Sequence, residues 1–215
     1  MSVLSLSHYW VPGMQGVPIL PTVEADHVLN INRGDAIRVQ HISAPSHMGT
    51  HIDAPSHTFA DGKTIDEYPL ERFIGNAVIS SPTCSYGTTI TVDDILAGGP
   101  APSRGDMLLI HTGWGEKFGD PEYLSHPSLD ESVAAWAADL ELNLIGMDLL
   151  TPELPAQDRD ESFAFQLHRG LLGADVLIAE NLFFPRVEER QVRVVAAPVA
   201  MSGGDAGWTN FVVEW

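Results

Sequence analysis

The 215-residue sequence contains one cysteine, few basic residues and no long apolar run. Because Cys84 has no second cysteine to pair with, neither an intrachain disulfide nor a thiolate metal cluster can form, and a metal ion would need nitrogen and oxygen ligands. Lysine and arginine number 11 against 29 acidic residues, and the net charge of −18 repels phosphate backbones and anionic lipids. We therefore expect neither a nucleic-acid partner nor a membrane partner.

No apolar run approaches the length of about 20 residues that a membrane-spanning helix needs. The first residues also lack the basic region and the apolar stretch of a secretory signal, so we expect a cytoplasmic protein. Hydrophobic residues make up 44% of the chain, and no repeat, low-complexity tract or linker interrupts it. The sequence therefore predicts one packed domain over residues 1–215.

Short apolar runs bounded by glycine, proline or aspartate predict buried strands, because these runs are too short for helices. Four such runs occur, at residues 77–79, 107–110, 144–147 and 176–179. Stretches rich in valine and isoleucine near both ends of the chain predict further β structure, at residues 36–42, 191–201 and 208–215.

Two helices are predicted between these strands. Ser128 and Glu131 form a capping box, and the amphipathic pattern that follows it ends at Leu140. The second helix is predicted over residues 162–172, with Gly173 as the left-handed residue that ends it.

The second helix and the strands on either side of it form a predicted βαβ unit, whose crossover is right-handed. Ligands of such units bind at the C-terminal ends of the strands, where Asp148 and Glu180 stand in this sequence. The predicted fold class is thus α/β, with a mixed central sheet and flanking helices.

One stretch, His47-Met-Gly-Thr-His51-Ile-Asp53-Ala-Pro-Ser-His57, places three imidazoles and a carboxylate within eleven residues. All four residues have odd numbers, so an extended chain would present them on one side. Full extension would separate His47 and His51 by about 13 Å, at roughly 3.3 Å per residue, which is close to the limit for sharing one ion. The chain must therefore bend between them, and Gly49 permits the bend.

This set of side chains predicts a metal site. A lone histidine on an apolar strand is most often structural, but four such groups packed together without an ion would lack polar partners. Imidazole nitrogen and carboxylate oxygen suit zinc, manganese or iron(II), and suit calcium poorly. Spacing alone leaves three roles open for His57, namely metal ligand, proton carrier and neighbour of the ligands.

The same stretch resembles the H-x-G-T-H-x-D-x-P-x-H signature of the cyclase family of metal-dependent hydrolases, which includes bacterial kynurenine formamidase and isatin hydrolase. All seven specified positions match. His168 and Glu180, twelve residues apart, look like the second metal-binding stretch of that family. Weaker similarity extends the resemblance to most of the chain, and it implies the swivelling β/β/α fold of the family.

The resemblance also implies the ligands of the metal. A first ion would bind His47, His51 and Asp53, with Glu180 also reaching it. A second ion would bind His168, with the two carboxylates bridging. The implied cofactor is Zn²⁺ or Mn²⁺, with one or two ions per subunit.

The activity implied by the resemblance is hydrolysis of the C–N bond of a small amide, formamide or cyclic amide. A metal-bound hydroxide would attack the carbonyl, and His57 would be the general acid and base. A homodimer or homotetramer is also implied. A polyketide cyclase or dehydratase with the same metal site and a metal-binding protein without turnover are the alternatives.

Two departures from the family pattern argue against kynurenine as the substrate. The loop that follows Trp10 lacks the tryptophan of kynurenine formamidases, and Asp205 is not followed by the arginine that the family carries there. Neither region holds a predicted metal ligand, so the resemblance itself stands. The sequence predicts no particular residue as a substrate contact.

Overall fold

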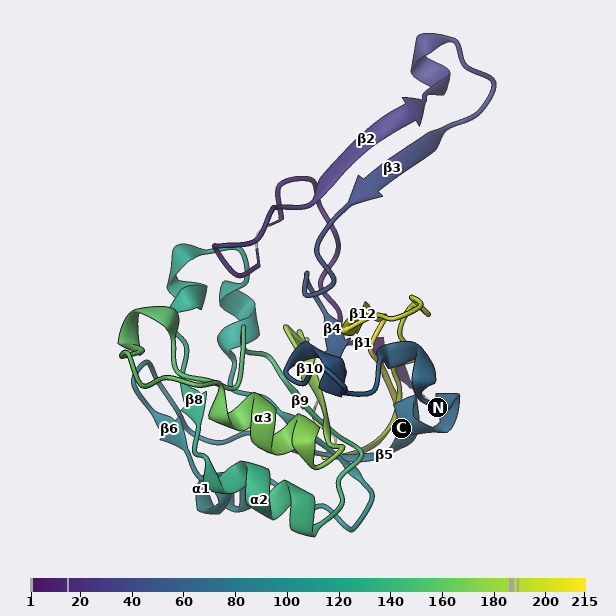
Figure 1. Cartoon of the computed structure of the whole chain (residues 1–215). Helices are drawn as coiled ribbons and strands as arrows, with labels where there is room; N and C mark the ends of the chain where they lie inside the picture. Colours follow the sequence, from purple (N-terminus) through teal and green to yellow (C-terminus); the bar gives the residue numbers. More distant parts are fainter. Residues whose placement is uncertain (1, 15, 186–187, 189) are drawn as a thin grey trace.

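The computed structural model describes residues 2–14, 16–185, 188 and 190–215. Their main element is a nine-stranded mixed sheet with the strand order β1-β13-β11-β5-β7-β9-β10-β4-β12 (Figure 1). Its strands are, in chain order, β1 Val3–Ser5, β4 His51–Asp53, β5 Ile74–Ser80, β7 Met107–Ile110, β9 Leu144–Met147, β10 Leu177–Glu180, β11 Gln191–Val195, β12 Ala206–Trp208 and β13 Val212–Glu214. Two small sheets pair β2 Glu24–Leu29 with β3 Val39–Ser43, and β6 Thr89–Ile90 with β8 Ser128–Leu129.

Four parallel strands, β5, β7, β9 and β10, form the centre of the large sheet. All residues of β7, β9 and β10 are buried. Burial on both faces explains why their sequences are continuous apolar runs instead of alternating patterns. The four strands predicted from these runs are confirmed, although β5 is longer than its run and β10 is shifted by one residue, so that Glu180 ends the strand.

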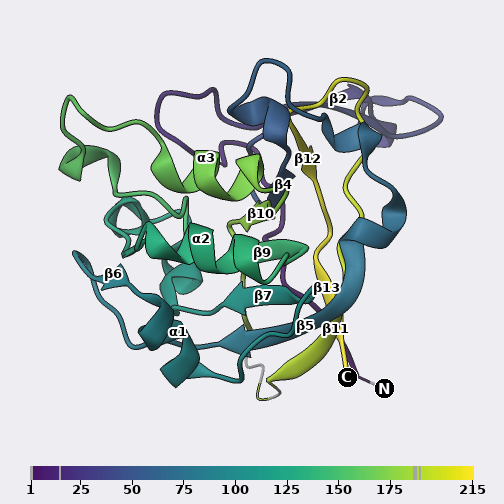
Figure 2. The same cartoon turned by 60° about the horizontal axis from the view of Figure 1, so that its bottom comes forward.

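The three α-helices of the described ranges lie on one side of the sheet (Figure 2), namely α1 Val92–Gly98, α2 Ser132–Asp139 and α3 Gln166–Gly173. An apolar core forms between the helices and that face of the sheet, and it includes Val133 and Leu171. The curled sheet encloses a second core on its other face, with Ile52 and Val213 among its residues. The predicted α/β class, with a mixed sheet and flanking helices, is therefore confirmed.

The predicted capping box of α2 is wrong. Ser128 lies in β8, which pairs with β6, so its backbone is extended and part of a ladder. The helix begins at Ser132 instead, whose backbone N–H donates to the Asp130 carboxylate at 3.0 Å. Strand pairing with a distant segment thus overrides the local capping signal.

The predicted start and end of α3 are also wrong. Ser162 donates its N–H to Asp160 in a turn, and Phe165 has a φ of +53°, in the left-handed region. Right-handed helical backbone cannot run through such a residue, so α3 begins at Gln166. Gly173 is the last helical residue, and the left-handed conformation occurs at Asp175, with a φ of +63°.

The β structure predicted near both ends of the chain occurs in β3, β11, β12 and β13. The hairpin of β2 and β3 extends away from the rest of the molecule (Figure 1). Short 3-10 helices complete the chain, namely η1 Ile31–Arg33, η2 Pro55–His57, η3 Ile65–Glu67, η4 Leu70–Phe73, η5 Trp114–Lys117, η6 Pro121–Leu124 and η7 Ala156–Asp158. Within the described ranges, no helix combines the length and the apolarity that crossing a membrane requires.

Candidate metal centre

The predicted bend between His47 and His51 is present at Gly49, whose φ is +61°. A Cβ at this position would lie 3.1 Å from the indole nitrogen of Trp10, so both the backbone conformation and the space favour glycine. The bend brings Nδ1 of His47 to 3.3 Å from Nε2 of His51. The two imidazoles therefore meet in spite of their separation along the chain.

β4 carries His51 and Asp53 on one face, because they are two residues apart in a strand. Nδ1 of His47 lies 2.8 Å from Oδ1 of Asp53, and Nε2 of His51 lies 3.2 Å from the same oxygen. His57 reaches the cluster by a different route from the one predicted. The chain turns at Pro55 into η2, so the extended period ends before His57.

α3 and β10 contribute the remaining two predicted ligands. β10 pairs with β4 in antiparallel register, with Glu180 opposite His51. Nε2 of His51 lies 3.5 Å from Oε2 of Glu180. Nε2 of His168 lies 3.3 Å from Oε1 of Glu180 and 3.7 Å from Oδ2 of Asp53. The structure thus brings all five predicted ligands into one cluster.

Three oxygens of the two buried carboxylates in this cluster lack a regular hydrogen bond to the described residues. In the described part of the chain, both oxygens of Asp53 and Oε1 of Glu180 are buried without a regular hydrogen bond, although imidazole nitrogens lie close to them. Burial raises the pKa of the Asp53 carboxyl, but His51 and His47 hold that pKa well below its ordinary value. A buried carboxylate without a partner is costly, so these oxygens fit a bound cation.

The same carboxylates, together with Glu153, raise the pKa values of two imidazoles in the cluster. Burial of His47 lowers its pKa, but Asp53 outweighs this effect and raises the pKa to about 9. Burial of His168 is likewise outweighed, by Glu153 and Glu180, and its pKa rises to about 10. The carboxylates therefore favour positive charge on the rings, and a metal ion that displaces the ring protons would meet the same attraction.

Among the residues that the structure describes, three overlapping triads could hold an ion. In each of them the candidate ligand atoms lie within 4.8 Å of one another. The triads are His47-His51-Asp53, Asp53-His57-His168 and His47-His57-Asp205. The donor set is nitrogen and oxygen throughout, as zinc and manganese sites require.

His57 lies at the edge of the cluster. Its ring centroid is 4.0 Å from that of His47 and 5.5 Å from that of His168, and Nδ1 is 3.8 Å from Oδ2 of Asp205. Burial lowers the pKa of His57, in contrast to the rings of His47 and His168. Its imidazole is therefore neutral at pH 7, with one nitrogen free to accept a proton.

The list of candidate site residues from the sequence omitted two carboxylates. Asp205 lies 3.0 Å from Nε2 of His47 and accepts a hydrogen bond from the Ser46 hydroxyl. Glu153 lies 3.0 Å from Nδ1 of His168. Carboxylates in such positions fix the tautomer and the orientation of metal-binding imidazoles. Asp205 stands in a region of weak resemblance to the family, whereas no signal in the sequence pointed to Glu153.

Asp148, which the βαβ pattern placed at a strand end where ligands bind, does not join the cluster. Its carboxylate accepts the N–H and the hydroxyl of Thr112 and the N–H of Gly113, at 2.7–2.8 Å. These hydrogen bonds hold the loop that follows β7, at Thr112 and Gly113, in place.

A cavity of about 460 Å³ opens beside the cluster. Ligand pockets of small molecules have this size. Its polar wall includes His47, His57, His168, Glu180 and Asp205. The rest of its lining is largely apolar and includes Val17, Pro18, Ile19, Leu20, Leu124, Leu150 and Phe165.

The sequence was compared with protein families and with known proteins. The family described as "Putative cyclase" matches residues 4–154. Kynurenine formamidase from Erythrobacter litoralis (strain HTCC2594) is 28% identical over 204 residues, which cover 93% of this chain and 88% of that protein.

Solved structures are similar over nearly the whole chain. Isatin hydrolase A from Labrenzia aggregata, bound to benzyl benzoate, has a TM-score of 0.84 at 21% identity and covers 99% of this chain and 93% of that one. A protein from Bacillus stearothermophilus described as a predicted metal-dependent hydrolase has a TM-score of 0.79 at 25% identity, with coverages of 99% and 97%. These likenesses confirm the predicted β/β/α fold.

Proposed function

The chain belongs to the cyclase family, and from this premise we propose that it is a metal-dependent hydrolase of the C–N bond in small amides, formamides or cyclic amides. The observation that carries the proposal is the cluster of three imidazoles around two buried carboxylates. In the described residues, three oxygens of these carboxylates take no hydrogen bond. A divalent cation would satisfy them.

The proposed ligands of a first ion are His47, His51 and Asp53, with Glu180 reaching it as well. A second ion would use His168, with Asp53 and Glu180 shared between the two. Zn²⁺ and Mn²⁺ both accept this donor set, since selectivity between them depends on geometry and supply. When bound, such an ion lowers the pKa of water to about 7 and polarises a carbonyl oxygen.

His57 is the proposed proton carrier. Its ring is neutral at pH 7 because burial lowers its pKa, so it can take a proton from water and return it to the leaving nitrogen. It lines the cavity together with His47 and His168, which puts it within reach of a bound substrate. Asp205, at 3.8 Å from Nδ1, attracts the positive charge that the ring acquires in the first step.

The proposal is tested by metal analysis combined with hydrolysis assays. Protein purified without chelator is analysed for metals, stripped, reloaded with Zn²⁺ or Mn²⁺, and assayed on formanilide and on a cyclic imide. We expect no activity in the stripped protein and metal-dependent hydrolysis after reloading. Full metal occupancy without hydrolysis of any amide would overturn the proposed function.

A pair of variants adds a control to this test. Asp53→Asn removes the carboxylate charge at the centre of the cluster, and we expect loss of both metal and activity. Asp93→Asn removes one charge from an exposed position in the first turn of α1 and should change neither. Normal metal content in Asp53→Asn would contradict the proposed ligand set.

We also propose that the protein is a cytoplasmic homodimer or homotetramer. The β2–β3 hairpin carries exposed aliphatic side chains, among them Val28 at 61%, Ile37 at 56% and Ile42 at 49% exposure. Since the hairpin extends away from the body of the same chain, a second copy is the proposed cover for these side chains (Figure 1). Light scattering tests this point, and we expect Ile37→Asp combined with Ile42→Asp to shift the oligomer toward the monomer. A monomeric wild-type protein at micromolar concentration would end the idea.

A further inference from the structure

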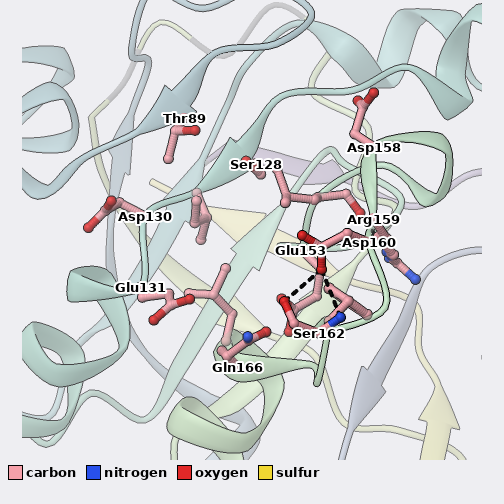
Figure 3. A pocket seen from close by; sticks show the side chains of 14 residues that line it. Thr89, Ser128, Asp130, Glu131, Glu153, Asp158, Arg159, Asp160, Ser162 and Gln166 are labelled. Atoms are coloured by element: carbon pink, nitrogen blue, oxygen red, sulfur yellow. Dashed lines mark hydrogen bonds between the residues drawn. The ribbon is translucent and has the colours of Figure 1, made fainter.

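Arg159 supplies the one lysine or arginine side chain among the described residues that line the cavity beside the metal centre. It also lines a second cavity, of about 380 Å³, which Figure 3 shows. Cations are scarce in this chain, with 11 lysines and arginines against 29 acidic residues. The contacts of the Arg159 guanidinium therefore indicate whether the cavity can bind an anionic ligand.

The carboxylates next to Arg159 in the sequence bind other groups. Asp158 accepts a hydrogen bond from the Tyr86 hydroxyl at 3.0 Å, and Asp160 accepts the N–H and the hydroxyl of Ser162 at 2.8 and 2.6 Å. In Figure 3 the Asp158 carboxylate points away from the guanidinium. The ion pairs of lysine and arginine in the described residues involve other basic side chains, and none includes Arg159.

The Arg159 side chain is nevertheless held in a defined position. Nε donates a hydrogen bond to the Leu154 carbonyl at 2.8 Å. The guanidinium carbon lies 4.2 Å from the ring centroid of Phe163 and 5.2 Å from that of Phe165. These contacts use one of the five N–H donors of the guanidinium, and the terminal nitrogens keep the forked geometry that binds a carboxylate through two parallel hydrogen bonds.

A partly buried guanidinium favours an anionic partner. The Arg159 side chain is partly buried, and burial lowers its pKa, while the carboxylates of Glu153 and Glu180 act in the opposite direction. The attraction between a partly buried cation and an anion is stronger than that of a fully exposed pair, because less water screens the two charges. Glu153 and Glu180 favour the charge of Arg159 from a distance, but among the described residues no carboxylate forms an ion pair with it, so its terminal nitrogens can take an anionic ligand of the cavity.

A second polar group in the same cavity also lacks a partner. His126 is 1% exposed, and its Nδ1 donates to the Pro127 carbonyl at 2.8 Å. Nε2 is therefore a hydrogen-bond acceptor, and in the described part of the chain no donor reaches it. The cavity thus offers one fixed cation and one fixed acceptor within a largely apolar wall.

We propose that Arg159 binds a carboxylate on the organic part of the substrate, so that the enzyme acts on acidic amides. The apolar body of the substrate would fill the cavity, with its amide carbonyl at the metal centre and an N–H or O–H group on His126. This inference rests on the proposed function and adds a substrate class to it.

The test compares substrates that differ only in the carboxylate. Metal-loaded wild-type protein is assayed on formanilide, 2-formamidobenzoate and 4-formamidobenzoate. We expect kcat/KM to be about 10-fold to 100-fold higher for at least one of the two acids, mainly through a lower KM, because a charge-assisted hydrogen-bond pair contributes binding of this size. Arg159→Gln should remove most of this preference, and Arg159→Lys should keep part of it. The control Arg104→Gln removes a charge from an exposed ion pair with Glu141 and should keep the whole preference.

Binding without turnover gives a second measurement. Titration calorimetry with benzoate and with benzamide is carried out on the metal-free protein, the Arg159 variants and Arg104→Gln. We expect benzoate to bind more tightly than benzamide, and its affinity to fall about tenfold or more in Arg159→Gln but not in Arg104→Gln.

The failures of the two proposals can be told apart. Hydrolysis of formanilide without any gain from a carboxylate would overturn the role of Arg159 and leave the hydrolase standing. If no formamide is hydrolysed by the metal-loaded protein, the hydrolase fails, and the benzoate titration alone decides about Arg159. Equal benzoate affinity in wild type and Arg159→Gln would then overturn it.

Discussion

Glu153 connects the metal centre to the start of a helix, and its removal should weaken both. Its Oε1 accepts the backbone N–H of His168 at 2.9 Å and lies 3.0 Å from Nδ1 of the same residue. His168 is the third residue of α3, and Phe165 provides no side-chain cap. Glu153 therefore acts as a cap from outside the helix, and it leaves Nε2 of His168 as the nitrogen that faces Asp53 and Glu180.

The size of the effect follows from these two contacts. Glu153→Ala removes the acceptor of a helix N-terminal N–H, which costs about 1–2 kcal/mol of stability. It also releases the imidazole, and the loss of a carboxylate that orients a metal-binding histidine lowers metal affinity about 10-fold to 100-fold. Glu153→Gln keeps an acceptor oxygen, so we expect a stability loss below about 1 kcal/mol together with a smaller loss of metal affinity.

Two measurements on the same samples check this prediction. Zinc affinity is measured by competition with a chromogenic chelator, and the stability of the metal-free protein by chemical denaturation. Glu131→Ala is the matched control, because Glu131 lines the same cavity as Glu153, shown in Figure 3, and its side chain provides no cap for α2. Wild-type zinc affinity in folded Glu153→Ala would refute the reasoning, since His168 would then bind no metal or would need no orienting carboxylate.

Three further predictions concern single residues. His57→Ala should keep nearly normal metal content while kcat falls about 100-fold or more, and an equal loss of metal would make His57 a ligand instead. Gly49→Ala should lose about 1–2 kcal/mol of stability, because φ is +61° at this position, and it should also bind the metal more weakly. The control Gly34→Ala, at a φ of +92° in the hairpin, should lose stability but keep its metal affinity. Burial raises the pKa of the Cys84 thiol to about 11. Its alkylation at pH 8 should therefore be roughly 100-fold slower than that of a free thiol and rise about tenfold per pH unit up to pH 10, and a rate that levels off near pH 8.5 would contradict this.

The sequence predicts the central strands well because burial on both faces of a parallel sheet leaves a continuous apolar run. It fails at the helix starts, since these depend on contacts that no local pattern contains. Ser128 satisfies a capping pattern, but its backbone N–H donates to the Thr88 carbonyl as β8 pairs with β6. Phe165 adopts a left-handed conformation that no local propensity favours.

Some residues of the candidate site could likewise be predicted from the sequence, and others could not. The stretch from His47 to His57 could be predicted as a cluster because its members are close in sequence and Gly49 allows them to meet. Asp205 lies 158 positions from the imidazole that it contacts, and Glu153 lies 15 positions from its own. Contacts of this kind depend on the packing of separate elements, so they become visible only in the fold.

The register of β4 in the sheet determines whether the cluster can exist. β4 lies between β10 and β12, with His51 opposite Glu180 on one side and opposite Trp208 on the other. A slip of one residue would move His51 and Asp53 to the face that now buries Ile52 in the apolar core, where their charges would have no partner. The burial of Ile52 therefore stabilises the same register that brings the imidazoles to Glu180. Because β12 pairs with the outer side of β4, the C-terminal segment helps to hold this register. The same segment supplies the carboxylate that contacts His47, since Asp205 directly precedes β12.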